Sequence, residues 1–266
     1  MSTDWLDLTR PEISYLFGFL QADGHLAKGP GQKGRLRIEL QARDGEILQR
    51  FAVLFPVHTC LKERTRDTNF KKNYSSISLT VYDLETRTAL NQLGLPYGKK
   101  DTLVAPPKVP YSKSDYFRGL LDGDGSVGIT ANGLPFISWM TTSPVLAEGI
   151  LDFIFEITGQ TKTNNPNKRD HSFNIMVTNE KAQDLARFLY PEGCLALERK
   201  RAKTFEMLAW ERPKNMIQVT WEKRKWSTAE DEFILSHSLI ESVNVLRRTE
   251  KSIKVRLSRL RPRKKA

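Results

Sequence analysis

Two aspartates stand at the same place in two similar stretches of the chain. Asp23 and Asp124 each follow an apolar run and directly precede a glycine, a residue that commonly ends a helix. Each run also holds two small residues four positions apart, which are Gly18 with Ala22 and Gly119 with Gly123. Because small residues at this spacing let two helix backbones approach closely, we predict that the two runs form helices that pack side by side.

This packing would have a chemical consequence. The two carboxylates would meet at helix C-terminal ends, where free carbonyls already carry partial negative charge, and they would repel each other unless a cation lay between them. With the backbone carbonyls of Ala22 and Gly123 just before them, they predict a divalent-metal site with oxygen ligands, which suits Mg²⁺. Either Asp-Gly pair alone is more often only a helix cap and turn, so it is the repetition that favours the metal site.

The two stretches, residues 16–24 and 117–125, resemble the LAGLIDADG motif of homing endonucleases. They match the motif at its glycine, its final aspartate and its final glycine. They depart from it at the usually small second position, which holds Phe17 and Arg118, and at the first acid, which is Gln21 in the first copy. The final acid is the catalytic one in that family, so the resemblance implies that Asp23 and Asp124 are catalytic metal ligands.

The resemblance also implies a mechanism and a partner. Members of this family make metal-dependent double-strand breaks in DNA, with four-stranded sheets in the major grooves that flank the cut. A basic residue from each half lies near the attacking water; by position it would be Lys99 or Lys100 and then Lys200, and we favour Lys100 and Lys200. An ordinary phosphate contact is the alternative role for each lysine. Gln41 is a candidate for orienting water in the first half, where the second half has Met140.

Alternating hydrophobic residues predict antiparallel strands in the first half. Residues 35–43, 57–66 and 74–82 alternate, with helical spacing between them at residues 46–55. The outer face of these strands is polar and basic, which is typical of sheets that read the DNA major groove, although a merely solvated face would alternate in the same way. The residues predicted to contact DNA here are Arg35, Arg37, Gln41, Arg43, Lys62, Arg64, Arg66, Ser76, Ser78 and Thr80.

The second half repeats this order with weaker alternation. Strands are predicted at residues 127–130, 134–141 and around 173–177, and helices at residues 144–158 and 179–190. We therefore predict an α+β fold with an internal duplication: two pseudo-symmetric αββαββα halves with antiparallel saddle-shaped sheets, packed through the two motif helices. The predicted domains are residues 1–100, a proline-marked linker at 101–111, residues 112–215 and a C-terminal module at 221–266.

The C-terminal module carries its own helix signals. Ser227 and Glu230 form a capping box after Trp226, and Thr249 is the predicted cap of a last helix. The pattern resembles a small Myb-like helix-turn-helix module of three helices, although a basic tail that merely holds phosphates would have a similar charge pattern. The DNA contacts predicted on its third helix are Lys251, Lys254 and Arg261.

Composition and charge indicate a globular protein with a polyanionic partner. The 266 residues carry a net charge of +11, and residues 221–266 hold 13 Lys and Arg against 6 Asp and Glu. The 4 histidines are scattered and the 2 cysteines lack zinc-ligand spacing, which excludes His-Asn-His nucleases and zinc sites. No apolar run approaches about 18 residues, and the N-terminal residues do not resemble a secretory signal, so a soluble intracellular protein is expected.

The expected partner is double-stranded DNA. Two motifs in one chain supply both halves of a pseudo-dimer, so we expect a monomer that cuts a long asymmetric target. Two other functions are compatible with the sequence. A regulator derived from the same fold would bind DNA without cutting it, although this chain keeps both acids. An intron maturase would bind the RNA of its own intron.

Overall fold

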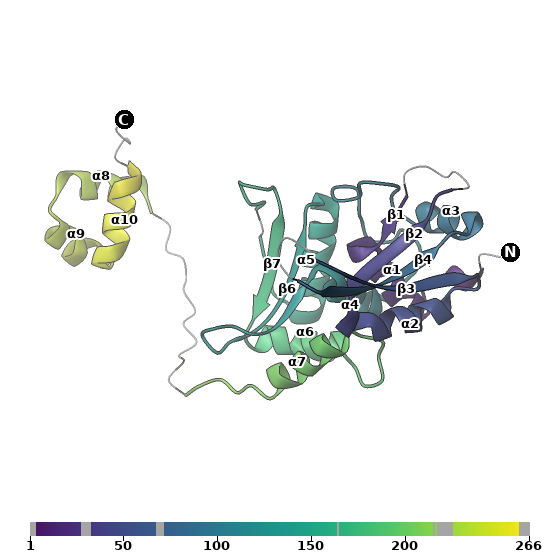
Figure 1. Cartoon of the computed structure of the whole chain (residues 1–266). Coiled ribbons are helices and arrows are strands. Elements are labelled where there is room, and N and C mark those ends of the chain that lie inside the picture. Colours follow the sequence, from purple (N-terminus) through teal and green to yellow (C-terminus); the bar gives the residue numbers. More distant parts are fainter. Residues whose placement is uncertain are drawn as a thin grey trace. The chain divides into compact units, whose positions relative to one another are not determined.

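A computed structural model of the chain describes residues 4–27, 33–67, 72–163, 165–214, 216 and 226–260. The chain divides into two compact units, Met1–Arg212 and Pro213–Ala266. The larger unit contains both motif stretches and two antiparallel sheets (Figure 1), which confirms the predicted α+β class. No helix in the described ranges is long and apolar enough to cross a membrane.

The first half of the larger unit follows the predicted order of helix, two strands, helix, two strands, helix (Figure 1). Its helices are α1 (Pro11–Asp23), α2 (Gly45–Leu54) and α3 (Leu84–Gln92), with short 3₁₀ turns at Asp4–Leu6 and Ala42–Asp44. Its strands are β1 (His25–Leu26), β2 (Leu36–Gln41), β3 (Thr59–Arg66) and β4 (Tyr74–Val81). They pair antiparallel in the order β1-β2-β4-β3, and the alternation read from the sequence places Leu36, Ile38 and Leu40 in the core.

In its described residues, the second half departs from the predicted repeat in two ways: it lacks one strand and it has an additional helix at its end. Its helices are α4 (Lys113–Asp124), α5 (Pro144–Thr158), α6 (Glu180–Leu189) and α7 (Glu198–Leu208). Its strands are β5 (Ser126–Ile129), β6 (Pro135–Thr141) and β7 (Phe173–Thr178), paired antiparallel in the order β5-β6-β7. The described residues between α5 and β7 form no strand, because α5 ends at Gly159 with φ 64° and a polar Asn- and Lys-rich segment without alternation follows.

α1 and α4 pack side by side, as the small residues predicted, and the pair lies between the two sheets (Figure 1). A Cβ atom placed on Gly18 would lie 2.2 Å from the Tyr116 carbonyl oxygen. One placed on Gly119 would lie 2.2 Å from the Tyr15 carbonyl oxygen. These distances leave no room for a side chain, so the two backbones touch at the motif glycines.

The glycines that directly follow the motif aspartates also have no room for a side chain. Gly24 has φ −72° and Gly125 has φ −96°, so neither adopts the left-handed cap that often ends a helix. A Cβ atom on Gly24 would lie 2.6 Å from the Leu20 carbonyl oxygen, and one on Gly125 would lie 2.7 Å from the Leu121 carbonyl oxygen. Gly24 and Gly125 are therefore needed because the chain packs closely at the two helix ends.

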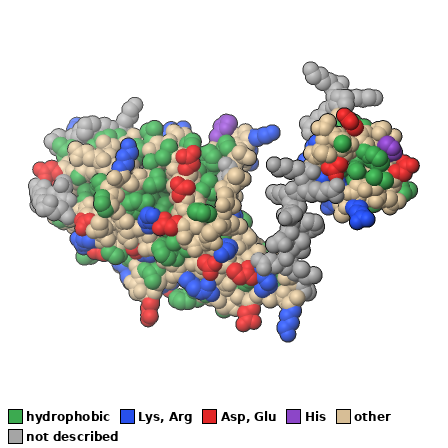
Figure 2. Space-filling view, turned by 180° about the vertical axis from the view of Figure 1, so that it is seen from behind, with side chains coloured by type: hydrophobic (Ala, Val, Ile, Leu, Met, Phe, Trp, Pro, Cys, Tyr) green, Lys and Arg blue, Asp and Glu red, His purple; other side chains and the backbone are tan. Residues whose placement is uncertain are grey.

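The larger unit shows no single basic patch on the face seen in Figure 2. Lys and Arg side chains are interspersed there with Asp, Glu and apolar side chains. The positive net charge is therefore not concentrated on that face.

The smaller unit consists, in its described residues, of α8 (Thr228–Ser236), α9 (Leu239–Leu246) and α10 (Glu250–Leu260). The predicted capping box of Ser227 and Glu230 is confirmed. The Thr249 hydroxyl accepts a hydrogen bond from the Ser252 amide at 3.3 Å at the start of α10. The centre of the Trp226 ring lies 4.0 Å from the Arg248 guanidinium and 5.9 Å from that of Arg256 on α10. The three helices agree with the predicted module, and its likeness to Myb domains stays a prediction.

Candidate active site

The motif aspartates lie side by side at the ends of α1 and α4. A Cβ atom on Gly123 would lie 2.3 Å from the Ala22 Cβ atom, so the two helices abut directly before the acids. Both carboxylates remain accessible to solvent. Partial burial, followed by the negative charge of Asp124, raises the pKa of Asp23 to about 6. Partial burial also raises the pKa of Asp124. Two carboxylates that oppose each other's ionisation form a site that a cation would stabilise.

One lysine from each half covers the C-terminal end of its own motif helix. Lys100 Nζ donates hydrogen bonds to the carbonyl oxygens of Leu20, Ala22 and Gly24 at 3.0, 2.5 and 2.6 Å. Lys200 Nζ donates to those of Leu121, Asp122 and Gly125 at 2.6, 2.8 and 2.8 Å. The Leu20 and Leu121 carbonyls also accept hydrogen bonds from the Gly24 and Gly125 amides, and each ammonium group supplies further donors that the end of a helix lacks. Lys99, the alternative to Lys100, is exposed, with its Nζ 3.8 Å from the Asp101 carboxylate.

The two lysines also have similar electrostatics. Burial lowers the pKa of Lys100 to about 8 and that of Lys200 to about 8, against the opposing influence of the nearby carboxylates. A lysine with this pKa is charged at pH 7 and releases its proton at a modestly higher pH. The structure thus brings together four of the residues predicted to be catalytic, while their roles stay predictions.

The oxygen donors at the helix ends fit a hard divalent cation. Carboxylate and carbonyl oxygens are the ligands that Mg²⁺ and Ca²⁺ prefer. Within the described ranges, no three His, Cys, Asp or Glu side chains gather into a cage, so a cation on Asp23 and Asp124 would complete its shell with backbone carbonyl, water or phosphate oxygens. Of the two predicted carbonyl ligands, Ala22 already accepts the 2.5 Å hydrogen bond from Lys100, which therefore competes for that oxygen.

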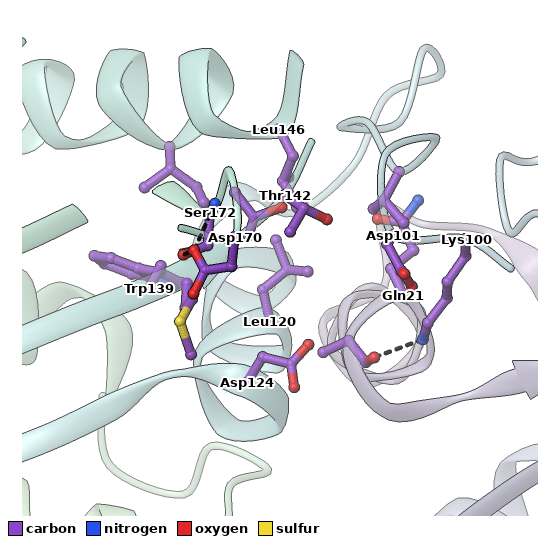
Figure 3. A pocket seen from close by; sticks show the side chains of 15 residues that line it. Gln21, Lys100, Asp101, Leu120, Asp124, Trp139, Thr142, Leu146, Asp170 and Ser172 are labelled. Carbon is purple, nitrogen blue, oxygen red and sulfur yellow. Dashed lines mark hydrogen bonds between the residues drawn. The ribbon is translucent and has the colours of Figure 1, made fainter. Parts of the chain in front are cut away.

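A cavity of about 380 Å³ opens beside the motif helix ends (Figure 3). Lys100 and Asp124 line it together with Asp101, which the sequence did not indicate as a site residue. Met140, on β6, also lines this cavity and is 58% exposed. Gln41 is exposed at the end of β2 and does not line it, so its predicted role in orienting water stays a prediction.

The outer face of the first sheet is basic and hollowed. A cavity of about 500 Å³ there is lined by Arg35, Arg37, Cys60, Lys62, Arg64, Ser78, Thr80 and Tyr82. The strand register places Lys62 opposite Ser78 and Arg64 opposite Ser76. The expected exposure of three residues on β4 is wrong, since Ser76, Ser78 and Thr80 are 1%, 6% and 8% exposed. They lie on a central strand, where the long side chains of β2 and β3 cover them.

Three arginines predicted to contact DNA are placed differently from the expectation. Arg43 lies in the 3₁₀ turn beyond the end of β2 and lines a separate cavity with residues of α2 and α7. Arg37 and Arg66 both pair with Glu39, at 2.9 and 3.4 Å. Part of the basic face is therefore neutralised internally, and the exposed side chains of Arg35, Lys62 and Arg64 carry its remaining charge.

The second sheet has a different outer face. Its three strands contain no charged residue, and Met140 and Met176 are 58% and 37% exposed. In the smaller unit, Lys251 and Lys254 are exposed on α10, where Lys254 pairs with Glu250. The third predicted contact of that helix, Arg261, lies outside the described residues.

Comparisons with known proteins find a similar architecture among solved structures. No family model matches the sequence, and no curated protein matches it. The solved structure of the homing endonuclease I-WcaI bound to its DNA recognition sequence is similar, with a TM-score of 0.53 and 12% identity over 79% of this chain and 90% of that chain. The LAGLIDADG homing endonuclease I-LtrWI bound to target DNA has a TM-score of 0.47 and 10% identity over 74% of this chain and 89% of its own. The chain therefore has the LAGLIDADG homing-endonuclease fold, as its two motif stretches predicted.

Proposed function

We propose that the protein is a site-specific DNA endonuclease that makes a metal-dependent double-strand break. The duplicated end of the motif helices carries this proposal: two adjacent aspartates, and beside each helix end a lysine that covers its carbonyls. Two such sets in one chain suit the two strands of a duplex. The fold supports the proposal, as does the DNA bound in the similar I-WcaI structure.

Asp23 and Asp124 would hold the cation, with the carbonyl oxygens of Ala22 and Gly123 as further ligands. When bound, Mg²⁺ neutralises charge on a scissile phosphate and supplies hydroxide from water near neutral pH. The chain's own contribution is to bring two carboxylates together at helix ends, where positive charge relieves their repulsion. Burial at the helix end, followed by the negative charge of Asp124, raises the pKa of Asp23 to about 6.

Lys100 and Lys200 would hold positive charge beside the phosphate. Their carbonyl acceptors fix the position of each Nζ atom, and a pKa of about 8 keeps each group charged at pH 7. Gln41 would orient water for the first site. Met140, its counterpart in the second half, is a poor hydrogen-bonding group, so the two sites would be unequal.

DNA would lie along the outer faces of the two sheets. Lys62 and Arg64 of the first sheet would contact phosphates or base edges in a major groove. The smaller unit would extend the contact on one side of the target through Lys251 and Lys254. Because one chain supplies both halves, a monomer would bind an asymmetric target.

Selection of cleaved sites from a randomised duplex library, with Mg²⁺ present, tests this function. We expect one long asymmetric target that is cut on both strands. The double variant Asp23→Asn/Asp124→Asn is the matched control and should retain the same duplexes uncut. Recovery of specific duplexes that the wild-type protein leaves intact would support a non-cleaving regulator instead, and preference for structured RNA would support a maturase.

A further inference from the structure

The sixth position of each motif holds a buried polar side chain that is not part of the proposed metal site. This residue is Gln21 in α1, 3% exposed, and Asp122 in α4, 1% exposed. Gln21 Nε2 donates to the carbonyl oxygens of Gly94 and Ala105 at 3.0 and 3.1 Å. These two residues stand before and after Lys100 in the chain, so Gln21 fastens the segment that carries the lysine of its own half.

Asp122 fastens the corresponding segment of the second half. Its carboxylate accepts hydrogen bonds from the Leu197 amide at 2.8 Å and from the Tyr190 hydroxyl at 2.6 Å. Leu197 directly precedes α7, and its carbonyl accepts a hydrogen bond from the Lys200 amide at 2.9 Å. The start of α7, and with it Lys200, is therefore tied to the motif helix through this carboxylate.

A tyrosine from the opposite half completes each of these arrangements. The Tyr116 hydroxyl of α4 donates to Gln21 Oε1 at 2.5 Å, and the Tyr15 hydroxyl of α1 donates to Asp122 Oδ2 at 2.7 Å. Both tyrosines are fully buried and stand three residues before the first glycine of their motif. The hydrogen bonds thus cross the helix pair in both directions.

We propose that Tyr15 and Tyr116 are positioning residues that act across the two halves: Tyr116 positions Lys100 through Gln21, and Tyr15 positions Lys200 through Asp122. The physical reason is that a buried polar atom needs a partner. The Gln21 amide can donate to both carbonyls only while its oxygen faces the Tyr116 hydroxyl. The Asp122 carboxylate accepts from Tyr190 and Leu197 as well, but a single oxygen accepts from both Tyr15 and Leu197. The effect of this positioning on cleavage rests on the proposed function.

Hydrogen exchange of backbone amides in the free protein tests, without DNA or metal, whether each tyrosine stabilises the lysine segment of the opposite half. Tyr116→Phe should speed exchange of amides in residues 95–104 by roughly fivefold, the equivalent of removing one hydrogen bond of about 1 kcal/mol, and leave residues 197–201 unchanged. Tyr15→Phe should do the reverse. Tyr97→Phe is the matched control, because the buried Tyr97 hydroxyl lies on the first segment and has no hydrogen-bond partner in the described part of the chain. Equal effects on both segments, or effects confined to the tyrosine's own half, would overturn the proposal.

Strand-resolved nicking of the selected target tests the consequence. Lys100→Met and Lys200→Met first identify the strand that depends on each lysine. Tyr116→Phe should then slow cutting of the strand that depends on Lys100 by about fivefold to tenfold. Tyr15→Phe should slow cutting of the other strand by a similar factor. Gln21→Met should reproduce the strand bias of Tyr116→Phe, and combining the two should add nothing, since both act on one contact. Uniform slowing of both strands would mean that the tyrosines only stabilise the fold, whereas absence of cleavage by the wild-type protein would refute the proposed function and leave the exchange result standing.

Discussion

The two halves of the larger unit agree at their helix ends and differ in their sheets. In both halves a lysine Nζ lies between 2.5 and 3.0 Å from three carbonyl oxygens at the end of the motif helix. The first sheet has four strands and basic side chains on its outer face, whereas the second has three strands without a charged residue. The parts that would do chemistry are thus present twice, and the surfaces that would recognise DNA are unlike each other. Such a molecule suits a target whose two sides differ in sequence.

The largest expected effect falls equally on both halves. Asp23→Asn or Asp124→Asn should reduce double-strand cleavage at least about a thousandfold, because either change removes a carboxylate from the proposed cation site. Binding of the target should be nearly unchanged, since neither side chain lies on a sheet face. Single-turnover cleavage and a binding titration on the same duplex measure both quantities. Cleavage at the wild-type rate by either variant would rule out the assignment.

Substitution of the lysines should separate the two halves. Lys100→Met and Lys200→Met should each slow cutting of one strand by about a hundredfold, and the affected strands should differ. The reason is that, among the described residues, each Nζ atom donates its hydrogen bonds to carbonyl oxygens at the end of its own motif helix. Labelling each strand at its 5′ end and following nicked and linear products gives the two rates. A similar loss from Lys99→Met would favour phosphate contact over a specific role for Lys100.

Removal of the smaller unit should affect one side of the target. A chain ending at Arg212 should protect a shorter stretch of DNA at one end, and the salt dependence of binding should fall by about 0.9 for each phosphate that this unit neutralises. The larger unit keeps its complete core, so some cleavage should remain at low salt. Footprinting and binding titrations at several salt concentrations test this expectation. An unchanged footprint and salt slope would show that this unit is not a DNA reader.

A smaller effect should distinguish the two sheets. Arg64→Ala should lower the slope of log affinity against log salt concentration by about 0.9 in magnitude. The reason is that the exposed Arg64 guanidinium lies on the basic face of the first sheet. Met176→Ala is the matched change on the second sheet and should leave the slope unaltered, because it removes no charge. The same binding titrations compare the two variants. Equal slopes would mean that Arg64 does not neutralise a phosphate.

The smallest expected effect concerns stability in the absence of metal. The folded-state pKa of Asp23, about 6, lies above its ordinary value of 3.8, so the folded protein binds this proton more tightly than the unfolded chain. Protonation of Asp23 therefore stabilises the folded protein fully below about pH 4, and this contribution is lost as the pH rises through about 6. In EDTA, Asp23→Asn should therefore melt higher than the wild-type protein at pH 7.5 and not at pH 4, by less than about 4 °C because the carboxylate is accessible to solvent. Thermal denaturation at both pH values measures the difference, and Mg²⁺ should reduce it at pH 7.5 by stabilising only the wild-type protein. A difference that is independent of pH would contradict the raised pKa.

Local patterns in the sequence predicted the fold and the centre of the site. The small-residue spacing and the Asp-Gly pairs correctly indicated that α1 and α4 pack side by side, and the favoured lysines lie at the ends of these helices. Features that depend on packing between distant segments were not predictable in this way. These include the burial of Ser76 under its neighbours, the position of Asp101 beside the motif ends, and the tyrosines that cross between halves.

The central claim is that the chain cuts both strands of one duplex with a divalent cation held at the motif ends. Single-turnover reaction of the wild-type protein with its selected target, in EDTA and then after addition of Mg²⁺, tests it most directly. The account predicts a bound and intact duplex in EDTA, and cutting of both strands by one protein per duplex once Mg²⁺ is added. Cutting in EDTA, or a duplex that stays bound and uncut in Mg²⁺, would contradict the account.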